Sequence, residues 1–208
     1  MHFLVKFFPE ITIKSKPVRR RLVSQLHENV KLVLREIDPE VEVRRGWDRL
    51  QVFTAPAPGP LQDRVLDALR RIAGITVILE VEEHPLPALG EIVDLVLPVY
   101  AERLAGRAFA VRCRRNGNHA FTSMDVERTV GSALLARTAA ARVQLRDPEV
   151  VVEIEISKKT LFVVGARHRG LGGYPVGSID PVLSLISGGF DSPVASYLTM
   201  KRGMRTHF

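Results

Sequence analysis

The sequence predicts an α+β protein: two units of mixed helices and strands, followed by a shorter strand, loop and helix. Three observations support this fold class. Apolar residues recur at helical spacing in several segments, and short runs rich in β-branched residues alternate with them. The first six elements have the order strand, helix, strand, strand, helix, strand. The composition, 46% hydrophobic and 25% charged over 208 residues, is that of one or two globular domains.

The first unit, residues 1–74, opens with a strand at residues 2–8, which we expect residues 11–13 to extend past Pro9. Pro17 opens a helix, because the N–H that proline lacks would have no partner in a first helical turn. The apolar stripe of this helix is Leu22, Leu26, Val30 and Leu34, and Asp38-Pro39 ends it. The remaining elements are strands at 41–43 and 50–53 around a turn at 46–48, a loop at Pro56, Pro58, Gly59 and Pro60, and a helix with Leu61, Val65, Leu69 and Ile72. A strand at 75–81, directly after the boundary at 74, completes the order. This is the split βαβ order of a ferredoxin-like domain.

The second unit, residues 75–168, also mixes helices with strands. Its elements are a helix with Leu89, Val93 and Leu97 that reaches Leu104, a strand at 108–113, a turn at 116–118, and a hairpin of 150–156 with 161–164. Thr122 and Asp125 have the spacing of a capping box and predict the start of another helix. Five glycines between 165 and 180 predict a linker or an ordered loop, and we place the interdomain linker at 169–181. Residues 182–208 then give a strand at 182–186, a helix at 193–201 and the start of a strand at 205–208.

The loop between that last strand and helix carries the most specific motif, Ser187-Gly188-Gly189-Phe190-Asp191-Ser192. Two adjacent glycines let a backbone approach a ligand closely, and the N–H groups of a first helical turn favour an anion. The spacing differs from a Walker loop. The motif resembles the SGGxDS pyrophosphate loop of ATP pyrophosphatases, whereas a glycine-rich turn with capping serines is the purely structural alternative.

That resemblance implies a role for each residue. The N–H and hydroxyl groups of Gly188, Gly189, Ser187 and Ser192 would hold pyrophosphate. Asp191 would orient the loop or reach Mg²⁺, which screens the triphosphate. Leu185 and Ile186 would offer backbone groups to adenine or ribose. ATP and magnesium are therefore the expected cofactors, with no metal site certain.

A second signal is positive charge. The net charge is +7, and 23 of the 30 cations are arginine, which suits phosphate recognition. Between residues 103 and 119 there are five arginines and no acidic residue. Arg112 and Arg114 fall on the strand face opposite Val111, Cys113 and Arg115, next to the polar turn that ends at His119. This pattern suits contacts to structured RNA, although a solvated basic edge would give the same pattern.

Three residues have plain structural interpretations. Cys113 is interpreted as a small buried residue, His119 as a polar contact and Trp47 as a core residue anchored in a turn. A single cysteine makes no internal disulfide, which fits a reducing cytoplasm, and no signal peptide or membrane-spanning run is present in the sequence.

Several segments together resemble bacterial tRNA 4-thiouridine synthetase, the tRNA sulfurtransferase or ThiI family. They are Phe8 to Ser15, Trp47-Asp48, Gly74-Ile75, Ile78 to Glu82, Arg112 to His119, Ser123 to Arg128, Gly172 to Gly177 and Leu183 to Ser192. The resemblance implies a ferredoxin-like domain, a THUMP domain for tRNA and the start of a pyrophosphatase (PP-loop) domain. The implied tRNA-binding residues are Lys14, Arg19, Arg112, Arg114, Arg115, Asn116 and His119.

In this family ATP would activate uridine 8 of tRNA at O4, and persulfide sulfur from a cysteine desulfurase would displace AMP. Asp191 is the candidate catalytic residue, and a linked role in thiamine thiazole synthesis is implied. The adenylating domain of the family continues well beyond its loop, so we expect this chain alone not to complete the reaction. The sequence leaves the oligomeric state open, with a homodimer as one alternative. The alternatives are an RNA-binding module without chemistry and a THUMP-bearing methyltransferase or deaminase, although a methyltransferase would need a GxGxG loop.

Overall fold

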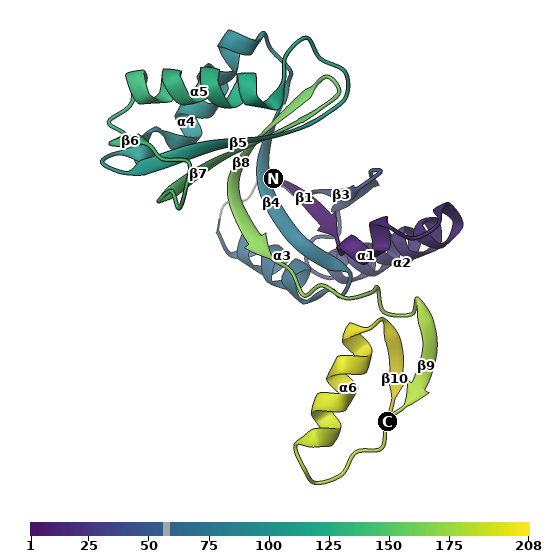
Figure 1. Ribbon diagram of the computed structural model, residues 1–208. Coiled ribbons are helices and arrows are strands. Elements are labelled where there is room, and N and C mark those ends of the chain that lie inside the picture. Colours follow the sequence, from purple (N-terminus) through teal and green to yellow (C-terminus); the bar gives the residue numbers. More distant parts are fainter. Residues whose placement is uncertain (56–58) are drawn as a thin grey trace. The chain divides into compact units, whose positions relative to one another are not determined.

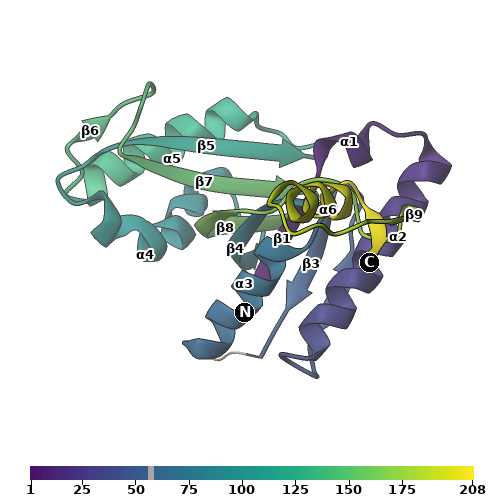
Figure 2. The ribbon, with the colours of Figure 1, turned by 90° about the horizontal axis from the view of Figure 1, so that it is seen from below.

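The computed structural model describes residues 1–55 and 59–208, so the predicted loop at Pro56 and Pro58 lies largely outside the described residues. The chain forms two compact units (Figure 1, and Figure 2 for the view turned by 90°). The first consists of Met1–Glu80 together with Arg167–Phe208, and the second is Val81–Ala166. Each unit has its own hydrophobic core.

The sheet of the first unit has the strand order β2-β3-β1-β4. The strands are β1 (His2–Phe7), β2 (Glu42–Arg45), β3 (Arg49–Phe53) and β4 (Ile75–Pro85), and every neighbouring pair is antiparallel. Helices α2 (Lys16–Arg35) and α3 (Pro60–Arg71) supply their apolar stripes to one core with alternate residues of β1. The predicted ferredoxin-like domain is therefore confirmed, because alternating strand residues and i+4 helix residues meet on one face of the sheet.

Two predictions in this unit are wrong. Residues 11–13 do not extend β1; Pro9–Thr12 form the short helix α1, in which Ile11 is fully buried. Pro9 has no N–H for a strand ladder, and its fixed φ suits a first helical turn. Trp47 is not a core residue, because 68% of it is exposed.

The second unit contains a short 3₁₀ helix η1 (Leu89–Glu91), helices α4 (Ile92–Leu104) and α5 (Ser123–Arg137), and strands β5 (Ala108–Asn116), β6 (Arg142–Val143), β7 (Val150–Ser157) and β8 (Thr160–Arg169). The strand order is β8-β7-β5-β6, with β5 parallel to both of its neighbours. Both helices contribute to one core with β5 and β7. The capping box is confirmed, since Thr122 Oγ1 accepts from the Asp125 N–H at 3.1 Å and Asp125 accepts in return from the Thr122 N–H at 2.8 Å.

The last segment contains β9 (Ile179–Leu183), α6 (Asp191–Lys201) and β10 (Met204–His207), and β9 and β10 are parallel. The strand expected at 182–186 lies earlier, so Leu185 and Ile186 are loop residues, and the helix begins two residues before the predicted 193. The glycine-rich segment before β9 is bonded to β4: the Gly170 N–H donates to Thr76 O at 2.9 Å and the Gly172 N–H to Ile75 O at 2.6 Å. These bonds attach the segment to the ferredoxin-like sheet.

Candidate functional site

The loop from Ser187 to Ser192 joins β9 to α6 and is closed by its own two serines. The backbone N–H of Ser187 donates to Ser192 Oγ at 3.0 Å, and the two hydroxyl oxygens lie 3.2 Å apart. The loop is also tied to the helix, because Ser196 Oγ donates to Ser192 O at 2.7 Å and lies 2.6 Å from Ser184 Oγ. The predicted ATP residues Ser187 and Ser192 are therefore brought together.

The glycines of this loop are not required by the fold. A Cβ at Gly188 would meet nothing within 4 Å, and one at Gly189 only Ser187 Oγ at 3.8 Å. Neither glycine has a positive φ. The backbone N–H groups of residues 188–190 donate to no acceptor within residues 1–55 and 59–208. Open glycines and free N–H groups at a helix N-terminus are what close backbone contact with an anion requires.

The other predicted residues of this loop are exposed. Leu185, Phe190 and Ile186 have 83%, 92% and 53% of their surface accessible, and Asp191 is exposed in the first turn of α6. Among the described residues, no group of three or more His, Cys, Asp or Glu side chains could hold a metal ion. A magnesium ion would thus fit here only with one carboxylate, that of Asp191, and with phosphate and water as its other ligands, which is a common arrangement for Mg²⁺.

The basic strand in the second unit is β5, and its three arginines have different surroundings. Arg112 Nη2 donates to Leu145 O at 2.6 Å, and Arg115 Nη1 donates to Gly117 O at 3.1 Å. Arg114 is exposed, and its side chain forms no hydrogen bond or ion pair with the part of the chain that the structure describes. Arg114 is therefore the arginine whose guanidinium is available to a partner, whereas the other two also hold loops.

His119 and Cys113 have the structural surroundings that the sequence predicts. The Nδ1 of His119 lies 2.8 Å from Arg115 Nη1 and its Nε2 lies 2.6 Å from Lys158 O, so the ring joins β5 to the hairpin turn. Asn116 ends β5 and its carbonyl accepts from the Lys158 N–H at 2.8 Å. Cys113 is buried, and burial raises its pKa to about 11, so this thiol is not a nucleophile at neutral pH.

In the first unit the two predicted cations lie over aromatic rings. Arg19 lies over exposed Trp47, with 4.8 Å from Cζ to the ring centroid, and Lys14 Nζ is 5.8 Å from the Tyr174 centroid. Trp47 and Tyr174 were not predicted from the sequence as binding residues, although each lies beneath one of these cations. The sequence did contain one indication for Trp47. It lies in a tight turn between two short strands, and the alternation of apolar and polar residues along those strands does not place a turn residue in the core.

Three domain descriptions match the chain. The ThiI ferredoxin-like domain matches residues 2–78, the THUMP domain residues 88–164, and the thiamine biosynthesis protein (ThiI) domain residues 177–208. The chain is thus a THUMP protein with a ferredoxin-like domain before the THUMP domain and a PP-loop segment after it. It belongs to the ThiI family and corresponds to the N-terminal portion of that family's proteins.

The chain is similar along its whole length to curated proteins named tRNA sulfurtransferase. It is 48% identical to the one from Pseudomonas putida and 49% identical to those from Pseudomonas aeruginosa and Azotobacter vinelandii. In each case the match covers 100% of this chain and 43% of the relative, so the chain spans less than half the length of these proteins.

Solved structures share the fold. PH1313 from Pyrococcus horikoshii superposes with a TM-score of 0.83 at 23% identity, over 99% of this chain and 67% of that one. A 4-thiouridine synthetase in complex with RNA and bound ATP superposes with a TM-score of 0.77 at 23% identity, over 100% of this chain and 52% of that one. Among the residues that the structure describes, no helix is long and apolar enough to cross a membrane.

Proposed function

We propose that this chain is the tRNA-binding portion, and the beginning of the ATP site, of a tRNA sulfurtransferase that makes 4-thiouridine. The observation that carries the proposal is the 48–49% identity, over every residue of the chain, to proteins named tRNA sulfurtransferase. The solved 4-thiouridine synthetase of the same fold contains RNA and ATP, which agrees with both ligands. The family description, thiamine biosynthesis protein, supports a linked role in thiamine biosynthesis as part of the proposal.

The surfaces described above support an RNA partner. Arg114 projects a free guanidinium from the end of β5, and Arg19 with Trp47 presents a cation and an aromatic face in the other unit. Arginine binds phosphate with a planar fork, and an exposed ring can stack on an unpaired base. We propose tRNA as the substrate and Lys14, Arg19, Arg112, Arg114, Arg115, Asn116 and His119 as its binding residues, with Arg112, Arg115 and His119 acting partly by holding loops.

The loop at the start of α6 supports ATP as the second substrate. Its free N–H groups at residues 188–190 and the hydroxyls of Ser187 and Ser192 would hold the pyrophosphate, and Leu185 and Ile186 would border the nucleoside. A magnesium ion bound to the phosphates would neutralise their charge, with Asp191 as its protein ligand. Without a bound cation the carboxylate of Asp191 would repel the triphosphate, so a magnesium ligand is the role that its charge allows.

The chemistry requires more protein than this chain. Uridine O4 attacks the α-phosphorus of ATP, pyrophosphate leaves, and the poor leaving oxygen becomes part of a good leaving group, AMP. The outer sulfur of a protein persulfide, which a cysteine desulfurase would supply, then attacks C4, and AMP leaves. A second thiol breaks the resulting S–S bond, so that 4-thiouridine is released and the two sulfur atoms left behind form a disulfide. Cys113 is buried with a raised pKa, so the sulfur-carrying cysteine has to lie beyond this chain in the longer protein.

The test uses the chain extended at its C-terminus to the length of its relatives. With tRNA, ATP and a persulfide donor, pyrophosphate should be released and 4-thiouridine should appear in the tRNA nucleosides by mass spectrometry. Ser192→Ala should reduce pyrophosphate release at least tenfold, because it removes a hydroxyl and opens the loop. Thr199→Ala, at a serine-like hydroxyl further along α6, is the matched control and should release pyrophosphate normally.

The alternative function, an RNA-binding module without chemistry, predicts a different outcome. It requires tRNA binding with no ATP-dependent pyrophosphate release by the extended protein. The unexplained glycines of the 187–192 loop favour the enzyme, since a turn alone requires neither Gly188 nor Gly189. Absence of both pyrophosphate release and 4-thiouridine, with tRNA binding retained, would refute the sulfurtransferase proposal.

A further inference from the structure

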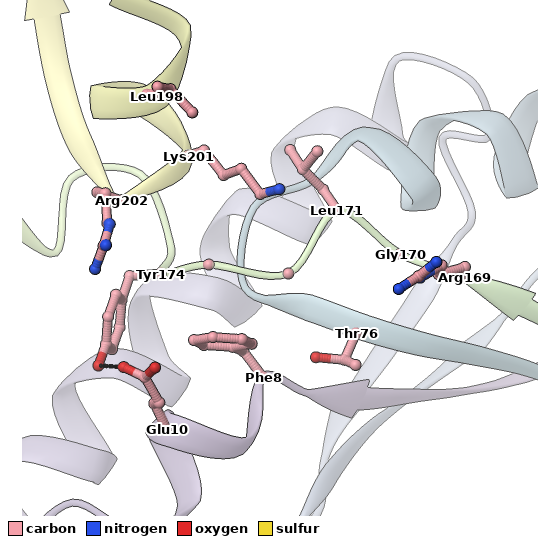
Figure 3. Close-up of a pocket in the computed structure, with 12 residues that line it drawn as sticks. Phe8, Glu10, Thr76, Arg169, Gly170, Leu171, Tyr174, Leu198, Lys201 and Arg202 are labelled. Carbon is pink, nitrogen blue, oxygen red and sulfur yellow. Dashed lines mark hydrogen bonds between the residues drawn. The ribbon is translucent and has the colours of Figure 1, made fainter. Parts of the chain in front are cut away.

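A cavity of about 550 Å³ lies within the first unit, away from the 187–192 loop (Figure 3). It lies where β1 ends, β4 begins, and the glycine-rich segment meets the C-terminal end of α6. Its volume falls within the roughly 300–1,000 Å³ of small-molecule sites. The lining residues are Phe8, Glu10, Thr76, Arg169–Tyr174, Leu198, Lys201 and Arg202.

The pocket is built by tight packing that tolerates no side chain at two of its glycines. A Cβ at Gly173 would lie 1.9 Å from Lys201 O, and Gly173 has a φ of +77°. A Cβ at Gly170 would lie 2.4 Å from Ile75 O. Two of the segments on which the family resemblance rests, residues 8–15 and 172–177, meet at this cavity. The sequence of these segments therefore determines the shape of the pocket, because the backbone can pack this closely only where glycine is present.

One wall of the pocket is aromatic and apolar. The rings of Phe8 and Tyr174 are half-buried and meet edge to face, with centroids 5.8 Å apart and planes at 81°. Leu171 and Leu198 also line the cavity. Such a wall suits a flat heteroaromatic group, because aromatic pairs gain from stacked and edge-to-face contact beyond the area they bury.

The rim of the pocket is cationic. Arg169, Lys201 and Arg202 line the cavity, against one carboxylate, that of Glu10. None of these three cations forms a side-chain hydrogen bond or ion pair with residues 1–55 or 59–208. In Figure 3, Arg169 comes from the β8 side and Lys201 and Arg202 from the α6 side of the pocket. Three cations without partners around one cavity favour a ligand with negative charge.

Glu10 adds a hydrogen-bond acceptor beside the rings. One of its oxygens, Oε2, accepts from the Tyr174 hydroxyl at 2.6 Å, as Figure 3 shows. Its other oxygen accepts no hydrogen bond from the rest of the described chain. An ionised carboxylate accepts and does not donate, so it pairs with an amino group and repels a carbonyl oxygen.

We propose that this pocket binds one nucleotide, with an amino-bearing base (adenine, cytosine or guanine) against Phe8, Tyr174 and Glu10 and its phosphate at the cationic rim. The aromatic wall would contact the ring of the base, the Glu10 carboxylate would accept from its amino group, and the cations would bind the phosphate. The nucleotide is either free or an unpaired residue of an RNA strand. This inference does not rest on the proposed sulfurtransferase activity.

The pocket is distinct from the ATP loop. The loop lies at the N-terminus of α6, and the pocket is lined by the last residues of that helix. Helix α6 has 11 residues, so at about 1.5 Å per residue its ends lie roughly 16 Å apart. One mononucleotide does not reach both sites, and a variant in one site should leave binding at the other unchanged.

The test measures dissociation constants of this chain for AMP and for a single-stranded adenosine tetranucleotide, with UMP and the uridine tetranucleotide as base controls. Lys201→Gln combined with Arg202→Gln removes two rim charges. Arg20→Gln combined with Arg21→Gln removes two exposed charges from α2, outside the pocket, and is the matched control. Glu10→Ala removes the acceptor, and Ser192→Ala alters the other site.

We expect the rim variant to weaken adenosine binding at least tenfold and the matched control less than twofold. Glu10→Ala should abolish the preference for adenosine over uridine, and Ser192→Ala should leave the pocket affinity unchanged. AMP binding that the rim variant weakens identifies a free nucleotide as the ligand of the pocket, and binding of the tetranucleotide alone identifies an RNA strand. If neither probe binds, or if the rim variant and its control bind equally, the proposal is overturned, whether or not the extended protein makes 4-thiouridine.

Discussion

The three arginines of β5 should separate when they are replaced one at a time. Arg114 has a free, exposed guanidinium, so Arg114→Ala should remove a phosphate contact without disturbing the second unit. Arg115 donates to Gly117 O and lies against His119, and its Nε is buried, so Arg115→Ala should also loosen the turn at residues 117–119. The variants therefore distinguish binding of RNA from support of the loop.

The magnitude follows from counterion release. One lost phosphate contact lowers the slope of log affinity against log salt by about 0.9. Between about 50 and 200 mM salt this equals about 0.5 in log affinity, a factor of roughly 3.5. The loss of tRNA affinity between these two salt concentrations should therefore be smaller by that factor in Arg114→Ala than in the wild type. The free energy of unfolding should change by less than about 0.5 kcal/mol. Arg115→Ala should cost about 1–2 kcal/mol of unfolding free energy, because it removes the hydrogen bond to Gly117 O and the part-buried one to the His119 ring.

The assay is tRNA binding by filter retention at four or more salt concentrations, with urea unfolding of the same samples. Arg107→Ala, at an exposed arginine just before the opposite end of β5, is the matched control of equal charge. A salt slope for Arg114→Ala equal to that of the wild type, or equal to that of Arg107→Ala, would refute the assignment of a phosphate contact to Arg114.

Four further outcomes are expected. Asp191→Ala should abolish pyrophosphate release by the extended protein and leave tRNA affinity and stability nearly unchanged; release at the wild-type rate would contradict its role. Cys113 should react with iodoacetamide at neutral pH only after denaturation, because burial raises its pKa to about 11. The pKa of His2 is lowered from 6.5 to about 4, chiefly by burial, so the contribution of His2 to stability should be constant above pH 6.5 and fall between pH 6.5 and 4; an NMR midpoint near 6.5 would exclude this. Thr122→Ala should cost about 1 kcal/mol in urea unfolding by removing the capping box, against no loss for the exposed Arg128→Ala.

Local patterns predicted most of the elements. The i+4 stripe of Leu22, Leu26, Val30 and Leu34 is buried along one side of α2, and the capping spacing of Thr122 and Asp125 begins α5. These signals are local, because helical periodicity and N-cap chemistry depend on residues within about four positions of one another. The SGGFDS loop was also found in this way, since its glycines and serines are adjacent in the chain.

Contacts between distant segments were not predicted. Trp47 was assigned to the core on residue type, yet its turn leaves it exposed beside Arg19 on α2. The different surroundings of Arg112, Arg114 and Arg115 depend on Leu145 and on the turn at Gly117, which alternation along one strand does not specify.

The sequence by itself determined the ferredoxin-like order, the THUMP resemblance and the pyrophosphate loop, because each rests on residues close together in the chain. Only the tertiary structure decided that the glycine-rich segment near residue 172 bonds to the start of β4 and that Phe8, Tyr174 and the end of α6 enclose a pocket. The bonds to β4 and the contact of Phe8 with Tyr174 join residues more than 90 positions apart. Their geometry depends on backbone hydrogen bonds and on the absence of a Cβ at Gly170 and Gly173, and such long-range packing leaves no periodic signal in the sequence.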